Sequence, residues 1–359
     1  MKNILFITSS ISFGGAAKML CFVAESLAIR GFNITIANLR ITQNVTDFER
    51  SLKNGVTVVS VPKSFGNIHV ISYIIRLGKK INADIVIGFT AFPNIYAVIV
   101  GKILHIPSII SERGDPYRTF DNSLKSRFMK YIINQATGGV FQTEGALKFY
   151  CKHLQNKGIV IPNPIFYVGE IPHVKYEERE KSIVSVGRLD NFQKRIDVML
   201  NAFKIFSKRH PDYTLKLYGR GMNENEIKQW CIDLGIADKV KFMGLSLHPM
   251  QDIAKDGMFL ITSDFEGISN SLLEAMAVGL PCVSTDHTPG GARLLIQDYE
   301  NGLLVPIGDS EGLAEAMCKF ADNPLLAKKC GNNAMNVINR FAPSRIIDMW
   351  ENYISSLLQ

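Results

Sequence analysis

Two glutamates stand eight positions apart in the sequence, Glu266 and Glu274, soon after the apolar run at 258–262. The residues between them predict a loop at the end of a strand and then the first turns of a helix. A helix start leaves backbone N–H groups unpaired and carries partial positive charge, so it suits a phosphate. At ~3.6 residues per turn, Glu274 is expected about two turns into that helix, where its carboxylate can accept hydrogen bonds from a ribose diol. An acidic loop before an ordinary amphipathic helix is the alternative, and these residues alone do not decide between the two.

Two cations follow the first apolar run of the second half, Arg188 and Lys194. A planar guanidinium and a point-like ammonium together suit the two phosphates of a diphosphate. Near the start of the chain, Gly14 and Gly15 would let a backbone approach a ligand without hindrance from a Cβ atom. Neither G-x-G-x-x-G nor G-x-x-x-x-G-K-[ST] occurs, so no dinucleotide or P-loop site is indicated. Each feature alone also fits a plain surface loop or a tight turn without a ligand.

Strand-like and helix-like stretches alternate along the whole chain, which predicts two parallel sheets with helices on both faces. In such sheets ligands bind at the carboxyl ends of the strands, where all of these motifs fall. The proline-containing stretch 164–181 interrupts the pattern and is predicted to link an N-terminal domain, 1–163, to a C-terminal domain, 182–343. The expected strands are 3–9, 33–39, 56–61, 85–89, 107–111, 139–142 and 158–161 in the first domain, and 182–186, 214–218, 240–243, 258–262, 282–285 and 303–305 in the second.

Composition narrows the possible functions. The apolar run at 4–7 is shorter than the ~7–15 residues of a signal peptide, and no stretch approaches the ~18 apolar residues of a membrane span. None of the six cysteines forms a C-x-x-C pair, which indicates a reducing cytoplasm and disfavours zinc. No D-x-D occurs, so the carboxylate pair that commonly holds a divalent cation on a nucleotide diphosphate is missing. We therefore expect no metal and no cofactor.

Charge is uneven along the chain. Residues 1–165 hold 19 basic and 8 acidic side chains, or +11, so the remainder carries −4 of the net +7. This asymmetry favours an anionic partner for the first half, either a substrate or the inner face of the cell membrane. No nucleic-acid-binding module is legible. The candidate basic helix faces, for which ordinary solvated surface is the alternative, lie at Arg76, Lys79 and Lys80 and at Lys125, Arg127 and Lys130.

Taken together, these residues resemble the family 4 glycosyltransferases of the GT-B fold. The resemblance rests on E-x7-E at Glu266 and Glu274, on 187–189 with Lys194, on the paired glycines, and on Asn-Gly-Leu-Leu-Val at 301–305. It implies two Rossmann-like, doubly wound domains facing a central cleft, with the last helix, 344–359, crossing back to the first domain. It also implies a retaining enzyme that transfers a sugar from a nucleotide-sugar to a hydroxyl of a glycan or polyprenyl-linked acceptor, as in the synthesis of O-antigen or capsule.

The resemblance also implies roles for single residues. Arg188 and Lys194 would hold the diphosphate, Glu274 the ribose hydroxyls and Glu266 the hydroxyls of the donor sugar. The stretch 285–293 resembles transferases with hexose or N-acetylhexosamine donors, and the base is expected to be uracil. The other donor contacts, to a phosphate or the base, would be made at Ser271, Leu272, Gly14, Gly15 and Gly244.

Two departures from the family pattern affect the mechanism. Arg113 stands where many relatives have a histidine near the reacting sugar, and Ala17 replaces an acidic residue. An arginine cannot act as a base, but it can stabilise a departing phosphate. With no evident nucleophile, retention would come from attack on the same face of an ion-pair-like intermediate. The alternatives are a nucleotide-sugar epimerase of the same fold and a catalytically silent scaffold at the membrane surface.

Overall fold

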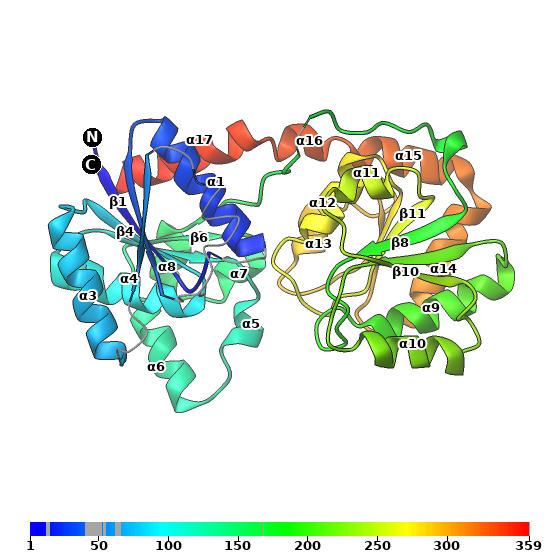
Figure 1. The fold of residues 1–359 in the computed structure, drawn as a ribbon, viewed down its shortest axis with the longest axis horizontal. Coiled ribbons are helices and arrows are strands. Elements are labelled where there is room, and N and C mark those ends of the chain that lie inside the picture. Colours follow the sequence, from blue (N-terminus) through cyan, green and yellow to red (C-terminus); the bar gives the residue numbers. More distant parts are fainter. Residues whose placement is uncertain (12–14, 40–51, 53–54, 62–65, 168, 359) are drawn as a thin grey trace. The chain divides into compact units, whose positions relative to one another are not determined.

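The computed structural model describes residues 1–11, 15–39, 52, 55–61, 66–167 and 169–358. These residues form two compact units, the first made of 1–163 together with 344–359, and the second of 164–343 (Figure 1). The stretch 164–181, which the sequence indicates as a linker, is therefore counted with the second unit. Each unit contains its own parallel sheet.

The first unit is built on seven parallel strands in the order β3-β2-β1-β4-β5-β6-β7. The inner strands β1, β4 and β5 are almost wholly buried, as expected for a parallel sheet covered on both faces. The strands are β1 (Asn3–Thr8), β2 (Asn33–Asn38), β3 (Val56–Ser60), β4 (Ile85–Phe89), β5 (Ser108–Glu112), β6 (Gly138–Phe141) and β7 (Ile159–Val160). The helices are α1 (Gly15–Ile29), α3 (Asn67–Lys80), α4 (Ala91–Leu104), α5 (Pro116–Thr119), α6 (Leu124–Ile133), α7 (Glu144–Lys148), α8 (Lys152–Lys157) and α17 (Pro343–Leu357).

The second unit repeats this plan with six parallel strands in the order β10-β9-β8-β11-β12-β13. The strands are β8 (Ser182–Val186), β9 (Thr214–Tyr218), β10 (Val240–Gly244), β11 (Met258–Ile261), β12 (Cys282–Thr285) and β13 (Leu303–Val305). The helices are α9 (Ile196–Arg209), α10 (Glu224–Asp233), α11 (Pro249–Ile253), α12 (Asn270–Ala277), α13 (Gly291–Leu295), α14 (Ser310–Asp322), α15 (Pro324–Ala334) and α16 (Val337–Arg340), with a short 3₁₀ turn at Tyr176–Glu178.

The strand order reverses once in each sheet, between β1 and β4 in the first unit and between β8 and β11 in the second. At such a reversal the connections from two neighbouring strands run in opposite directions and leave a crevice at their carboxyl ends. In the second unit, the loops that leave β8 and β11 contain Arg188 and Glu266. The topology therefore brings together two motifs that are far apart in the sequence.

The final helix, α17, packs on the first unit. Trp350 is fully buried and stacks on Phe89 with ring centroids 6.3 Å apart. The Tyr353 hydroxyl donates to the carbonyl of Lys157 at 2.6 Å and accepts from the backbone N–H of Gly139 at 2.8 Å. Aromatic burial and paired polar atoms thus anchor the end of the chain to β6 and α8.

The predicted fold class is confirmed: both sheets are parallel and doubly wound. Expected and observed strands agree to within about two residues, because each strand is an apolar run bounded by polar residues or glycine. Gly31 follows the first helix with a φ of +91°, a conformation that suits glycine just after a helix end. Within the described ranges, no helix is both long enough and apolar enough to cross a membrane.

Candidate active site

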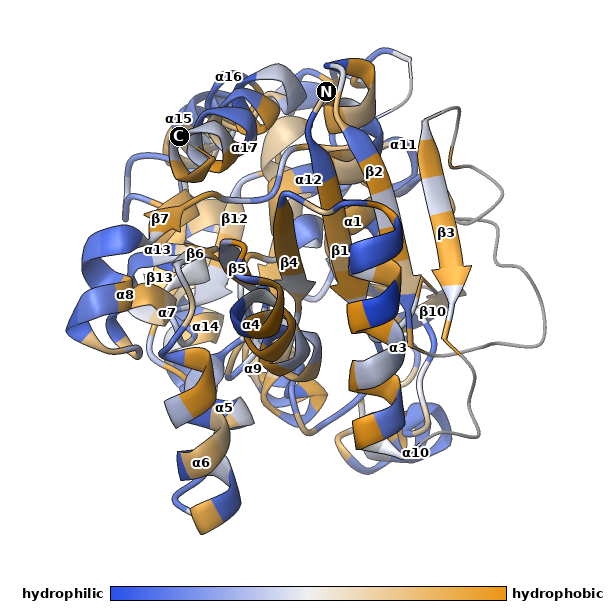
Figure 2. Ribbon diagram, turned by 90° about the vertical axis from the view of Figure 1, so that its left-hand side faces the viewer, coloured by the Kyte–Doolittle hydropathy of each residue, from blue (hydrophilic) through white to orange (hydrophobic). Residues whose placement is uncertain are grey.

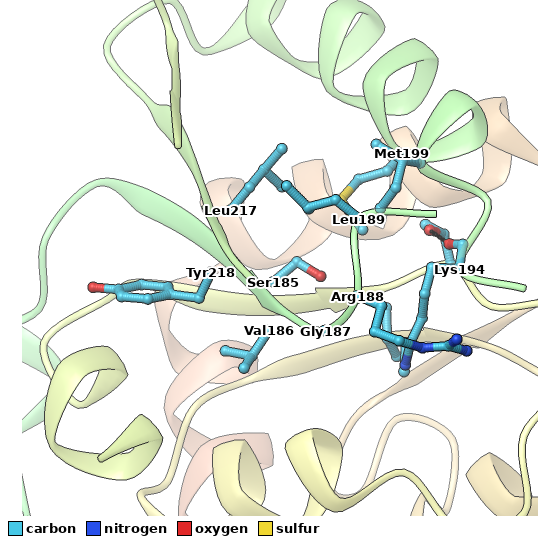
Figure 3. A pocket seen from close by; sticks show the side chains of 12 residues that line it. Ser185, Val186, Gly187, Arg188, Leu189, Lys194, Met199, Leu217 and Tyr218 are labelled. Atoms are coloured by element: carbon cyan, nitrogen blue, oxygen red, sulfur yellow. Dashed lines mark hydrogen bonds between the residues drawn. The ribbon is translucent and has the colours of Figure 1, made fainter. Parts of the chain in front are cut away.

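A pocket opens at the carboxyl end of β8 in the second unit (Figure 3). Its wall combines apolar side chains from β9 and α9 with the two predicted cations. Arg188 and Lys194 lie at the same end of the pocket. The lining residues are Ser185, Val186, Gly187, Arg188, Leu189, Lys194, Ile196, Met199, Leu217, Tyr218, Ile261 and Thr262.

Lys194 and Glu266 form an ion pair between their Nζ and Oε1 atoms, although 72 positions separate them in the sequence. Both side chains are nearly buried, at 14% and 10% exposed. A lysine ammonium has three donors, so this contact leaves capacity for a ligand. The structure thus joins a predicted diphosphate residue directly to the predicted sugar-binding carboxylate.

The Glu266 carboxylate is fixed on several sides. The Ser263 hydroxyl donates to Oε1 at 2.8 Å, and the Glu266 backbone N–H donates to the carbonyl of Thr288 at 2.8 Å. Burial alone would raise the pKa of Glu266, but the charge of Lys194 and the hydrogen bonds from Lys194 and Ser263 outweigh it and hold that pKa below its ordinary value. Glu266 is therefore an anion at neutral pH, suited to accept hydrogen bonds from sugar hydroxyls.

His287 lies buried in this same cluster. Burial lowers the pKa of its imidazole, although the negative charge of Glu266 acts to raise it. The packing is close, because a Cβ on Gly291 would lie 3.0 Å from His287 Cε1 and 1.7 Å from the carbonyl oxygen of Gly267. The loop after β12 thus forms one wall around Glu266.

Arg188 lies at the open side of the site. Its side chain is 69% exposed, donates to Gln193 Oε1 at 2.5 Å and lies 3.5 Å from an Asp190 carboxylate oxygen. Gln193 in turn donates to the carbonyl of Phe265 at 3.0 Å. An exposed guanidinium held by one short contact can turn toward an incoming phosphate with little loss of internal bonding.

Helix α12 begins later than the sequence predicted. Its cap is Ser269, whose hydroxyl accepts from the Leu272 N–H at 3.4 Å, so Glu274 is the fifth helical residue and lies just over one turn in, not two. The reason is a long-range contact: Phe265 pairs with Thr288 in an isolated bridge and the Glu266 N–H donates to the Thr288 carbonyl, which holds these residues outside the helix. Ser271 lies in the first turn, as required of a residue whose backbone meets a phosphate.

The glycines near the pocket serve two different purposes. A Cβ on Gly219 would lie 1.8 Å from the carbonyl oxygen of Gly187, and one on Gly221 would lie 2.0 Å from that of Leu189. These two glycines therefore let the loops after β8 and β9 touch. Gly244 differs, because it adopts a φ of +72° with no atom within 4 Å of its missing Cβ.

Arg113 belongs to the first unit, at the end of β5. Its guanidinium donates to Asn163 Oδ1 at 2.5 Å and lies over the ring of Phe89, 5.5 Å from the centroid. Burial lowers its pKa to about 9, which leaves it a cation at neutral pH. Among the predicted glycines of this unit, Gly15 is exposed at the start of α1, and Gly14 lies outside the described residues.

Four residues that shape the site were not singled out from the sequence. Thr262 donates to the carbonyl of Lys194 at 2.8 Å, and Ser263 holds Glu266. Arg195 adopts a φ of +49° and pairs with Asp264 at 3.0 Å, and Gln193 links the two loops. Thr262 and Ser263 could have been noticed in the sequence as two hydroxyl residues directly after an apolar strand. The contacts of Arg195 and Gln193 depend on the fold and left no such signal.

No three His, Cys, Asp or Glu side chains gather in the way a metal site requires, among the residues that the structure describes. The site instead combines a buried carboxylate, two cations and the start of a helix at a strand-order reversal. This combination is typical of α/β proteins that bind a phosphorylated ligand at the carboxyl edge of a sheet.

Comparisons with known proteins agree with this class. Residues 170–337 match a family model described as glycosyl transferases group 1, and residues 13–142 match one described as glycosyl transferase 4-like. An uncharacterized glycosyltransferase of Haemophilus influenzae is 24% identical over 99% of this chain and 100% of its own length. Also 24% identical, over 99% of both chains, is the GalNAc-α-(1→4)-GalNAc-α-(1→3)-diNAcBac-PP-undecaprenol α-1,4-N-acetyl-D-galactosaminyltransferase of Campylobacter jejuni.

Solved structures show the same fold. The Anabaena protein HepE, in complex with UDP, superposes with a TM-score of 0.81 at 20% identity, covering 99% of this chain and 100% of that one. The two family models together span most of the present chain. The protein is an enzyme, a glycosyltransferase of the group 1 family with the GT-B fold, and the resemblance drawn from the sequence is confirmed at that level.

Proposed function

We propose that the enzyme transfers a hexose or N-acetylhexosamine from a UDP-linked donor to a hydroxyl of a glycan or polyprenyl-linked acceptor, with retention at the anomeric carbon and without a metal ion. The observation that carries this proposal is the buried Lys194–Glu266 pair beside α12 and Arg188. A buried anion next to a cation would suit a ligand that carries sugar hydroxyls close to phosphates, which supports a nucleotide-sugar as the donor.

The donor would bind along this row of groups. Arg188 and Lys194 would contact the diphosphate, helped by the backbone at Ser271 and Leu272, and Glu274 would accept from the ribose hydroxyls. Gly244, with open space at its missing Cβ, is the candidate for the edge of the base pocket. That HepE has been solved with UDP and with UDP-glucose supports uracil as the base.

Charge on the leaving diphosphate would be offset by protein groups. Two cations and a helix N-terminus can supply the electrostatic stabilisation that a divalent cation provides elsewhere. The missing D-x-D pattern supports this reading. Arg113, still a cation at neutral pH, is proposed as a further contributor from the first unit.

Retention would follow from attack on the face that the diphosphate leaves. The acceptor oxygen would bond to the anomeric carbon as the bond to the phosphate oxygen breaks, and the acceptor proton would pass to that phosphate oxygen. Glu266, held by Lys194 and Ser263, would orient the sugar rather than attack it. The Campylobacter relative named for an undecaprenol diphosphate acceptor supports a lipid-linked acceptor and hence work at a membrane.

A transfer assay tests the proposal. Purified enzyme in EDTA is incubated with UDP-glucose, UDP-galactose, UDP-GlcNAc or UDP-GalNAc and a polyprenyl-diphosphate oligosaccharide, and the anomeric configuration of the product is read by NMR. We expect one donor to be used, with its configuration kept. An inverted product, or activity only after magnesium is added, would contradict the mechanism. Conversion of the donor sugar with no acceptor present would indicate an epimerase instead.

A further inference from the structure

Helix α6 in the first unit presents large apolar side chains to solvent. Leu124 is 82% exposed, and Phe128 and Tyr131 are each 64% exposed. Their spacing of four and then three residues places them on one side of the helix. Figures 1 and 2 both show α6 at the edge of this unit, away from the sheet.

The opposite side of α6 anchors it to the unit. Ile133 is buried in the core beneath α4 and β6, and Met129 and Ile132 pack against that core. Lys130 also faces inward, with its Nζ 3.7 Å from the centroid of the Phe149 ring. The helix is therefore already held by its buried side, and packing within this unit does not require the exposed apolar residues Leu124, Phe128 and Tyr131.

Two exposed cations flank the stripe, Lys125 on one side and Arg127 on the other at helical spacing. Neither has a carboxylate partner within the described part of the chain. Asp121 is the one acidic residue between 120 and 134, and its carboxylate accepts from the hydroxyls of Ser123 and Ser126, each at 2.5 Å. An apolar stripe bordered by cations is the pattern of a helix that lies in the interface of an anionic bilayer.

We infer that α6 docks this enzyme on an anionic lipid bilayer, with Leu124, Phe128 and Tyr131 inserted among the acyl chains and Lys125 and Arg127 at the head groups. The inference rests on the proposed function, because it explains how a polyprenyl-linked acceptor and the enzyme come to the same surface. The sequence indicated two basic segments, which lie on α3 and α6, and this inference assigns membrane docking to the segment on α6.

Helix α3, the other segment, lacks such a stripe. Its apolar residues, among them Ile74 and Leu77, pack into the core of the first unit. Only Ile68, which is 79% exposed, faces solvent as a large apolar side chain, while Arg76, Lys79 and Lys80 form a basic, solvated side. Helix α3 therefore provides matched control positions of the same charge and similar exposure.

Vesicle co-sedimentation of the full chain tests the inference. Vesicles of phosphatidylglycerol with phosphatidylethanolamine are compared with pure phosphatidylcholine, at about 0.1 M and about 1 M salt, where the Debye lengths are roughly 10 Å and 3 Å. The apolar variant is Phe128→Ser with Tyr131→Ser, and its control is Ile68→Ser. The charge variant is Lys125→Glu with Arg127→Glu, and its control is Lys79→Glu with Lys80→Glu.

We expect the apolar variant to bind anionic vesicles at least about tenfold more weakly at both salt concentrations, because it removes two inserted rings. The charge variant should lose the preference for anionic lipid at low salt, and both controls should bind like the wild type. Absence of wild-type binding, or equal losses in the controls, would overturn the inference. So would a dimer that the apolar variant converts to monomer with vesicle binding unchanged, since a second copy would then cover the stripe.

Calorimetric titration with UDP is run on the same preparations. UDP binding without vesicle binding would refute only the docking of α6. Vesicle binding without UDP binding would instead refute the proposed donor.

Discussion

Replacing Glu266 by glutamine tests the buried ion pair that organises the site. The substitution keeps the volume and removes the charge, so Lys194, whose side chain is only 14% exposed, loses its counter-ion. Breaking one partner of a buried pair costs about 3–5 kcal/mol. Since about 1.4 kcal/mol corresponds to a factor of ten, the second unit should open roughly 100- to 4,000-fold more readily.

Hydrogen exchange measures the opening of one unit by itself. A global unfolding curve does not, because a chain with two units need not unfold in a single step. The amides of β11 (Met258–Ile261) lie beside the site and report on it. Asp212→Asn is the control, because it breaks an exposed pair with Lys181 at 2.6 Å in the same unit. Solvent screens an exposed pair and leaves it little net stabilisation, so the control should change exchange by less than about tenfold.

The effect should depend on pH and on ligand. Because the pKa of Glu266 is lowered from 4.5 in the folded protein, its stabilisation is present above about pH 4.5 and is lost as pH falls through the folded-state value. Variant and wild type should therefore converge in acid. At neutral pH, UDP should narrow the difference, because the diphosphate supplies Lys194 with a new counter-ion. An exchange rate within threefold of wild type at pH 7 would refute the reasoning.

Three further predictions follow from the same structure. Glu274→Ala should weaken UDP binding about tenfold or more in calorimetry. The ligand 2′-deoxy-UDP should bind the wild type with a similar loss of affinity. It should lose little more in the variant, because the Glu274 carboxylate that would accept from the missing hydroxyl is already gone. Turnover should be unchanged by EDTA; a loss that magnesium restores would rule out the metal-free mechanism. Tyr353→Phe should lower the free energy of opening of the first unit by about 1–3 kcal/mol, read from hydrogen exchange of the β6 amides, since it leaves the Gly139 N–H without an acceptor; an unchanged exchange rate would show that water replaces the hydroxyl.

The sheets were predictable because each strand carries its own signal, a short apolar run bounded by polar residues or glycine. The start of α12 was not, since it depends on the bridge between Phe265 and Thr288, which are 23 positions apart. The residue types Arg188, Lys194, Glu266 and Glu274 indicated the ligand chemistry. Their direct contacts, above all that between Lys194 and Glu266, arise only from the order of the strands.

The glycines also show what could not be predicted from the sequence. Gly219 and Gly221 appear in the sequence only as positions without a side chain, and the sequence does not record what lies in the place of that side chain. In the fold, the backbone after β8 fills that space. Similarly, basic residues on α3 and α6 look alike in sequence, and only the packing shows that α6 turns its apolar stripe outward.

A crystal structure of the enzyme with UDP, grown in EDTA, tests the central claim most directly. The account predicts a diphosphate held by Arg188, Lys194 and the start of α12, with the ribose hydroxyls on Glu274 and no ordered cation between the phosphates. UDP bound away from the carboxyl ends of β8 and β11, or bound there with the ribose turned away from Glu274, would contradict it.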